Sequence, residues 1–168
     1  NILGKPLELA SGTVLKNRFC KSATSETLGD SRNAPTQKLV RLYRAWAQGG
    51  AALLVTGNVM VDRRQIGEPG NVVVEDERDM GMLKAWAEAG AVNGSHIWMQ
   101  LNHPGKQTPK TLSAQPVAPS AVPFRTELGR FFNPPRALNA AEIRNLITRF
   151  ARTAEIAKKA GFTGVQIH

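Results

Sequence analysis

The sequence predicts an α/β fold built on parallel strands, and two features of the chain indicate it. Four short apolar runs alternate with segments whose apolar residues recur at helical spacing. Strands that alternate with helices in this way form parallel βαβ units. With 42% hydrophobic and 21% charged residues over a length of 168, the chain has the composition of an ordinary globular unit with one core.

The chain begins with a predicted hairpin and a predicted strand. Apolar stretches at 6–9 and 13–15 flank Ser11-Gly12, a pattern that indicates a small β-hairpin within residues 1–16. Residues 17–23 follow as the first strand that we expect in the main sheet.

The first predicted helix begins after Pro35-Thr36 and ends at Gly49-Gly50. Its apolar residues fall on one face, and they are Leu39, Leu42, Tyr43, Trp46 and Ala47. Residues 51–57 then form an apolar run that is too short for a helix and ends in Gly. Such a run is typical of a strand that is covered on both faces.

A second helix and a third strand repeat this pattern. Leu83 and Trp86 mark the helix, Asn93-Gly94 ends it, and residues 96–101 form the predicted strand. We expect Trp46 and Trp86 in the core, because both lie on apolar helix faces.

A long excursion precedes the last helix. Residues 102–138 hold seven of the chain's ten prolines, which predicts loops and short turns of functional importance. Asn139 is a suitable N-cap with Glu142 three residues later, and the helix continues to Gly161. Its apolar stripe consists of Ile143, Leu146, Ile147, Phe150, Ala154 and Ala157. Residues 164–168 then predict a fourth strand.

Two architectures fit four alternating units. A doubly wound sheet is complete at this length, whereas a (β/α)8 TIM barrel needs about 250 residues, so only about its first four units would be present. A phosphate-binding doubly wound fold needs a Gly-rich first turn between strand and helix. Residues 24–30 contain neither G-x-G-x-x-G nor G-x-x-x-x-G-K-[ST]. The pattern therefore favours the barrel.

The net charge of +9 raises the question of a nucleic-acid partner. The basic residues are dispersed, and the aromatic residues form no stacking series among them, so we expect no nucleic-acid partner. We expect no membrane segment either, because no apolar run approaches the ~20 residues that a bilayer requires. The single Cys20 excludes an intramolecular disulfide and fits a reducing compartment, which predicts a cytoplasmic location.

Polar side chains follow each predicted strand, where parallel α/β folds place their chemistry. They are Ser22, Thr24, Ser25, Thr56, Asn58, Gln100, Asn102, His103 and His168. Loop residues that only stabilise turns would give the same pattern. Hydroxyls, amides and imidazoles without a cluster of Cys or carboxylates are unsuited to a metal or hydrolytic site. They suit a planar ligand rich in heteroatoms, because a Gln amide both donates to and accepts from a pyrimidine-like edge.

Four separated segments match, in order, the motifs of one enzyme family. Residues 15–25 look like its first barrel strand, and residues 49–57 look like its second. Residues 98–106 are similar to its Q-L-x-H-x-G-[RK] strand, and residues 160–168 are similar to its A-G-F-D-G-V-E-I-H strand. Over nearly its whole length the chain thus resembles the N-terminal half of an Old Yellow Enzyme, a flavin oxidoreductase with a TIM-barrel fold.

The resemblance implies that FMN is the cofactor and NAD(P)H the reductant. It also implies hydride transfer from the flavin to the C=C bond of an α,β-unsaturated carbonyl compound. The family's flavin contacts carry over to Ser22, Ala23, Thr24, Ser25, Gly57 and Gln100. His168 matches the first of two residues that bind the carbonyl oxygen of the substrate, and is the catalytic residue that we expect. No metal is implied.

Three residues depart from the family pattern. Ser25 stands where many members have Cys or Thr, Ala23 where Pro is usual, and Thr27 where one subclass has a Tyr that touches substrate. The resemblance therefore leaves the flavin potential and the substrate class open.

A different interpretation is a non-catalytic fragment or subunit. A half barrel has open sheet edges, through which it would bind a partner or form a homo-oligomer. On the leading interpretation, residues 1–168 are the N-terminal half of a single flavin-binding TIM-barrel domain, and we expect them to be inactive alone.

Overall fold

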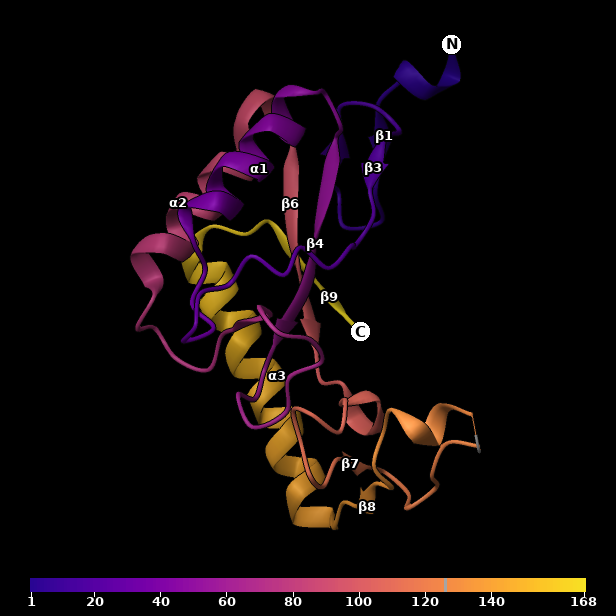
Figure 1. Cartoon of the computed structure of the whole chain (residues 1–168). Coiled ribbons are helices and arrows are strands. Elements are labelled where there is room, and N and C mark those ends of the chain that lie inside the picture. The colour runs from indigo at the N-terminus through magenta and orange to yellow at the C-terminus, as the bar shows by residue number, and fades with distance from the viewer. Residues whose placement is uncertain (126) are drawn as a thin grey trace.

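Parallel strands in the middle of the molecule are joined by long helical crossovers (Figure 1). The structure is a computed structural model that describes residues 1–125 and 127–168. The sheet has the order β3 (Cys20–Lys21), β4 (Leu53–Met60), β6 (His96–Asn102), β9 (Gly164–Ile167), and each neighbouring pair is parallel. A further short strand, β5 (Val72–Val73), pairs with the end of β4. Each main strand therefore lies beside the one that precedes it in the chain.

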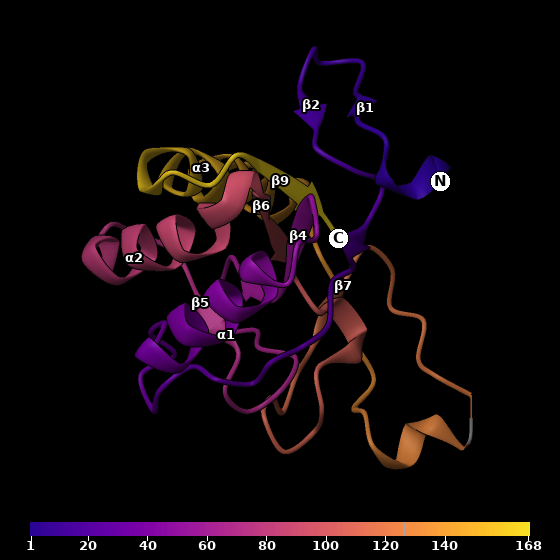
Figure 2. The ribbon, with the colours of Figure 1, turned by 90° about the horizontal axis from the view of Figure 1, so that it is seen from above.

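The three long helices cover one face of this sheet. They are α1 (Gln37–Gln48), α2 (Met80–Ala91) and α3 (Ala140–Ala160), and Figure 2 shows them as an outer arc around the strands. A doubly wound sheet carries helices on both faces, whereas a barrel carries them only outside. The arrangement confirms the predicted α/β class and its barrel type, with four strand positions present.

The main core lies between the sheet and the helices. Leu54, Ile97 and Met99 project from the strands into it, and each is fully buried or nearly so. Tyr43 and Trp86 pack edge to face between α1 and α2, with ring centroids 5.4 Å apart. Trp46 is partly buried against the same core, so the prediction that both helical tryptophans pack there is confirmed.

A smaller apolar cluster occupies the other face of the sheet. It joins Leu53 and Val55 of β4 to Leu15, which belongs to the N-terminal hairpin. The hairpin pairs β1 (Leu7–Glu8) with β2 (Val14–Leu15) in antiparallel register. Because strand side chains alternate between faces, the hairpin packs on the face opposite to the helices.

Two strand boundaries differ from the prediction. The first strand is confined to Cys20–Lys21, because Asn17 accepts a hydrogen bond from Phe19 N at 3.0 Å and turns the chain before it. The second strand was predicted to end at Gly57, and this is wrong, since β4 continues to Met60. Gly57 instead lies at an irregularity inside the strand, which is described below.

The last helix has the predicted capping box, in which Asn139 and Glu142 bond to each other's backbone N–H. Its apolar stripe is only partly in the core. Ile156 and Ala157 are buried, whereas Ile147 is 63% exposed, because the first half of α3 extends beyond the sheet. Among the described residues, no helix is both long enough and apolar enough to cross a membrane.

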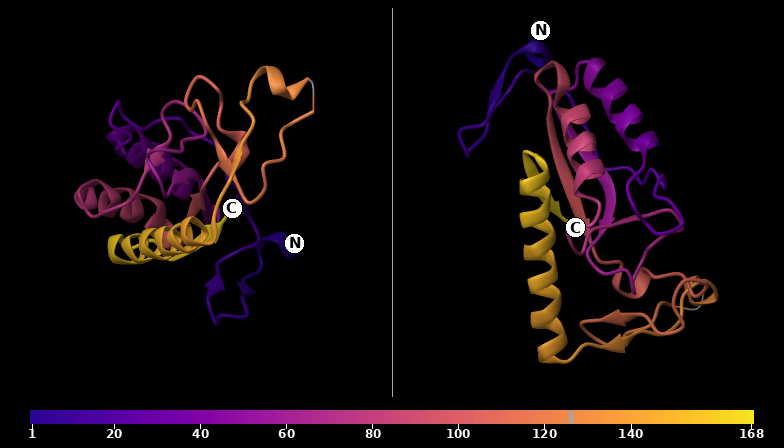
Figure 3. Two further views of the ribbon diagram at one scale, coloured as in Figure 1. Left: turned by 90° about the horizontal axis from the view of Figure 1, so that it is seen from below. Right: turned by 90° about the vertical axis from the view of Figure 1, so that its left-hand side faces the viewer.

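The excursion before α3 projects from the carboxyl ends of the strands (Figure 3). It is mostly irregular, as predicted, but contains the parallel pair β7 (Val117–Ala118) and β8 (Arg136–Ala137). Its short 3-10 helices are η3 (Gly105–Gln107) and η4 (Leu128–Arg130). Two further 3-10 helices, η1 (Ile2–Gly4) and η2 (Val92–Gly94), lie elsewhere in the chain.

Candidate functional site

The register of β4 against β6 shifts between Val55 and Asn58, which places a bulge at Thr56 and Gly57. At the bulge, the side chain of the fully buried Thr56 takes the place of a backbone acceptor from β4. Its Oγ1 accepts a hydrogen bond from Gln100 N at 2.9 Å. The same hydroxyl donates to Gly57 O at 2.8 Å. Bulges are frequent beside active sites, where they redirect side chains. Here the bulge fixes the position of Gln100.

The segment that follows β3 crosses closely over Gly57. A Cβ atom on Gly57 would collide with the Thr24 carbonyl and the Glu26 carboxylate, and would lie 2.9 Å from Ser25 Cα. In addition, Gly57 N donates to Glu26 Oε1 at 2.9 Å. The close approach therefore requires glycine, and it joins the predicted residues Thr24, Ser25 and Gly57 in one place.

The four predicted residues after β3 differ in exposure. Ser22 and Thr24 are exposed, whereas Ala23 packs against the apolar cluster of Leu53 and Val55. The Ser25 hydroxyl donates to the Glu68 carboxylate and lies 3.5 Å from the donor Asn71 Nδ2. The Thr24 hydroxyl donates to Ser22 O at 3.5 Å. Ser22 and Thr24 thus present exposed hydroxyls to a ligand, whereas the Ser25 hydroxyl is bonded to other parts of the protein.

Gln100 is only 6% exposed, and its side chain forms a hydrogen bond with a side chain of the neighbouring strand β9. Its Nε2 donates to Gln166 Oε1 at 2.7 Å. Next along β6, Asn102 Nδ2 donates to Asn58 Oδ1 at 2.9 Å. Sequence reasoning missed Gln166, although a residue two positions before His168 in a strand must lie on the same face.

His168 directly follows β9, and its backbone N donates to Leu101 O at 3.0 Å. Gln166 is the direct partner of Gln100 in the register, so the residue two positions later lies on the same face and nearer the carboxyl end. The exposed His168 and the buried Gln100 therefore share one end of the sheet. The expectation that they would do so is confirmed.

Sequence reasoning missed a network of polar side chains at the two ends of the segment 22–25. The network consists of Lys21, Glu26 and Tyr43. Lys21 Nζ lies 3.8 Å from Glu26 Oε1 and 3.2 Å from Tyr43 Oη. Burial lowers the pKa of the Lys21 ammonium, and the neighbouring Glu26 charge opposes that shift. Burial also raises the pKa of the Tyr43 hydroxyl far above its usual range, and the Glu26 charge adds to the effect.

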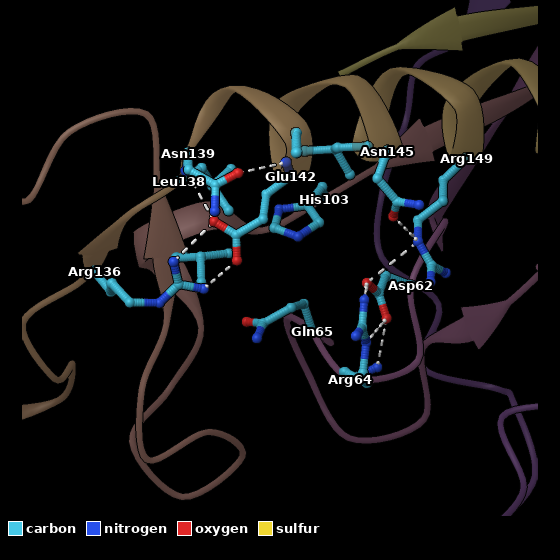
Figure 4. Close-up of a pocket in the computed structure, with 13 residues that line it drawn as sticks. Asp62, Arg64, Gln65, His103, Arg136, Leu138, Asn139, Glu142, Asn145 and Arg149 are labelled. Carbon is cyan, nitrogen blue, oxygen red and sulfur yellow. Dashed lines mark hydrogen bonds and ion pairs between the residues drawn. The ribbon is translucent and has the colours of Figure 1, made fainter.

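A separate cavity of about 520 Å³ lies between the first half of α3 and the loops after β4 and β6 (Figure 4). His103 lines it, and burial lowers the pKa of this imidazole, which favours the neutral form. Its Nδ1 accepts from Gly105 N at 3.1 Å, so His103 orients the loop after β6. None of the six predicted cofactor contacts lines this cavity, nor does His168.

Charged side chains that line the cavity form ion pairs with one another. Arg64 lies 2.7 Å from Asp62, and Arg136 lies 2.8 Å from Glu142. Burial disfavours the ionised form of Asp62, but hydrogen bonds from Arg64 outweigh it and lower the pKa of this carboxyl. Within the described residues, no group of three or more His, Cys, Asp and Glu side chains is placed to hold a metal ion.

Substituting Thr56 by Val is expected to lower the free energy of unfolding by about 1–3 kcal/mol, because Gln100 N then has no acceptor in a buried place. Thr153→Val is the matched control, since Thr153 is 1% exposed and donates only to Val74 O. Both variants should lose stability in denaturant unfolding. Only Thr56→Val should accelerate hydrogen exchange at the Gln100 amide, and equal exchange in the two variants would contradict the role of the bulge.

The chain matches, over residues 3–168, the family described as the NADH:flavin oxidoreductase / NADH oxidase family. The NADH-dependent flavin oxidoreductase nadA of Aspergillus parasiticus is 38% identical over 181 residues, which cover 99% of this chain and 40% of that protein. The NADH oxidase of Thermoanaerobacter brockii is 36% identical, over 92% of this chain and 24% of that protein.

Solved structures show the same relation. The old yellow enzyme homologue from Zymomonas mobilis superposes with a TM-score of 0.86 at 26% identity, over 100% of this chain and 48% of that one. Morphinone reductase in complex with tetrahydroNAD superposes with a TM-score of 0.87 at 25% identity, over 100% and 49%. The chain spans between about a quarter and a half of the length of these four proteins.

Proposed function

This chain belongs to the NADH:flavin oxidoreductase / NADH oxidase family, and we propose that it forms the N-terminal half of a flavin-binding barrel. The cofactor of the family is FMN, and its reductant is NAD(P)H. We propose that the complete barrel is an oxidoreductase that reduces the C=C bond of an α,β-unsaturated carbonyl compound, a small-molecule substrate.

The observation that carries this proposal is the bulge in β4. On one side Thr24 and Ser25 lie closely against Gly57, and on the other Thr56 holds Gln100 by a hydrogen bond. One end of the sheet thereby brings together side-chain hydroxyls, the backbone around Gly57 and the amide of Gln100. A flat, heteroatom-rich ring system is the kind of ligand that such an arrangement fits.

In the proposed complex, residues on the two sides of the bulge contact different parts of the flavin ring. Ser22 and Thr24, both exposed, would meet the redox-active side of the ring, and Gly57 would lie beside its pyrimidine end. Gln100 would bond the pyrimidine edge, where its amide supplies both a donor and an acceptor. Because Gln100 now donates to Gln166, a ligand would compete with that side chain.

FMN, when bound, supplies the hydride that reaches the substrate. The chain's own contribution to the reaction is His168, which we assign as the catalytic residue. An imidazole at this position would donate to the carbonyl oxygen of the substrate, where negative charge develops. Its exposed side chain at the carboxyl end of β9 supports this role, because barrel enzymes bind their substrates at that end.

The complete protein is expected to be yellow and to bind FMN in a ratio of one to one, whereas the isolated 168 residues should bind it poorly. Barrels of this type grip a phosphate mainly with loops after the seventh and eighth strands, and this chain supplies four strand positions. Flavin absorbance measured during gel filtration tests both statements. Stoichiometric flavin that co-elutes with a verified 18.2 kDa species would contradict the second.

Association through open edges is a second candidate function for the isolated chain. It is favoured by Ile167, which is 75% exposed in β9. Among the described residues, this strand pairs only with β6 and leaves its other edge open. Unpaired strand edges with apolar side chains promote pairing with another chain. Analytical ultracentrifugation of the 18.2 kDa chain should therefore show species larger than a monomer. A purely monomeric distribution would remove this candidate.

A further inference from the structure

Two oppositely charged side chains are mostly buried between the sheet and α1. The side chains of Lys21 and Glu26 are 16% and 9% exposed. Lys21 Nζ donates to Val55 O at 2.8 Å and lies 4.5 Å from the centroid of the Trp46 ring. Tyr43, which is fully buried, donates its hydroxyl to the Glu26 carboxylate. Burying two charges carries a desolvation cost that a pair of apolar side chains would avoid.

The pair brackets the four residues that we assign to the cofactor. Lys21 immediately precedes Ser22, and Glu26 immediately follows Ser25. Both charged side chains point toward the helix side, where they meet Tyr43 of α1. The ion pair therefore joins the two ends of a short loop, in which Ser22 and Thr24 are exposed.

The loop has few other attachments to the sheet. β3 ends at Lys21, and within the described chain no backbone-to-backbone hydrogen bond joins residues 23–27 to another segment. Glu26 supplies the missing link, because its carboxylate accepts from Gly57 N at 2.9 Å. Ser25 bonds to Glu68 and Asn71 outside the main strands, so the Glu26 carboxylate is the hydrogen-bonded link that fixes the distance of this loop from Gly57 in β4.

We propose that Glu26 is a positioning residue for the flavin, acting through Ser22 to Ser25 and held in place by Lys21 and Tyr43. This inference rests on the function proposed above. Glu26 would not contact the cofactor, since its carboxylate bonds to Tyr43 and to Gly57 N on the inner side of the loop. Its effect on the cofactor is therefore indirect, through the placement of the loop.

The test uses the complete protein and three variants at these positions. Glu26→Ala removes the link to Gly57, and Glu26→Gln keeps an acceptor but leaves the Lys21 charge unpaired. The double variant Glu26→Gln with Lys21→Met removes both charges together. Leu83→Ala is the stability control, because Leu83 is fully buried in α2 and belongs to the same core.

Two quantities are measured below the melting temperature of each variant. They are the FMN dissociation constant from fluorescence titration and the visible absorption spectrum of the flavin at saturation. Glu26→Ala should weaken FMN binding by about 10-fold or more, which is the effect of removing the side chains that orient metal ligands, and should shift the spectrum. Glu26→Gln should show a similar change, and the double variant should recover most of the affinity.

Failure of the two proposals would look different. A wild-type protein that binds no FMN overturns the proposed function itself. A wild-type protein that binds FMN, with a Glu26→Ala loss no larger than that of Leu83→Ala and an unchanged spectrum, overturns only the role of Glu26. Because Glu26→Gln and the double variant keep a side chain in the buried position, they decide the question if Glu26→Ala does not fold.

Discussion

His168→Ala in the complete protein is expected to slow reduction of an enone by about 100-fold or more, which is the usual cost of losing one oxyanion-type donor. Reduction of the flavin by NAD(P)H should slow much less, because the nicotinamide forms no enolate that needs the imidazole. Stopped-flow measurement of the two half-reactions, each in isolation, separates these effects.

The alternative is that His168 only completes the last strand. Its backbone N–H to Leu101 O bond persists in the Ala variant, and its side chain is exposed, so the fold should keep its stability. His96→Ala is the matched control, since it removes an imidazole from the opposite end of β6. Equal slowing of both half-reactions, together with a lowered melting temperature, would remove His168 from the catalytic role.

Gly57→Ala should destabilise the fold by about 1–3 kcal/mol, the range for an added group in a packed place, and should abolish measurable FMN binding. The new methyl group would meet the Thr24 carbonyl and lie 2.9 Å from Ser25 Cα, so the whole loop would have to move. That loop carries four of the proposed cofactor contacts. The loss of binding should therefore exceed what the loss of stability alone explains.

Gly81→Ala is the control for this substitution. Gly81 is in α2, and a Cβ added there has no atom within 4 Å. Alanine in a helix is favoured over glycine by up to about 1 kcal/mol, so this variant should be as stable as the wild type or more stable. Chemical denaturation and FMN titration of both variants check the contrast. Unchanged stability and affinity in Gly57→Ala would refute the close approach.

The helices and the order of the elements could be predicted because they depend on local signals. Apolar residues at helical spacing, the Asn139 cap and the Gly161 stop act within a few residues, and all three appear in the structure. Strand limits depend on partners that lie far away in the chain. The end of β4 was misplaced because glycine is uncommon within strands, whereas Gly57 lies at a bulge inside β4 in close contact with Thr24.

The candidate site was predictable to a similar degree. The rule that parallel strands share one carboxyl end brought Gln100 and His168 to the same place. Glu26 was missed because it acts through Gly57 N, a partner that only the folded chain reveals. Gln166 was within reach of the two-residue strand period, but its bond to Gln100 Nε2 is visible only in the folded chain. Likewise, the exposure of Ile147 depends on how far α3 extends beyond the sheet.

The sequential strand order also bears on how the chain folds during synthesis. Each new strand, from β4 to β6 to β9, pairs with a neighbour that the ribosome has already released, and none has to insert between two strands that are already paired. Chains fold from the N-terminus during synthesis, and in this order the partner of each new main strand is already made. The sheet would grow in one direction, with β9 as its advancing edge.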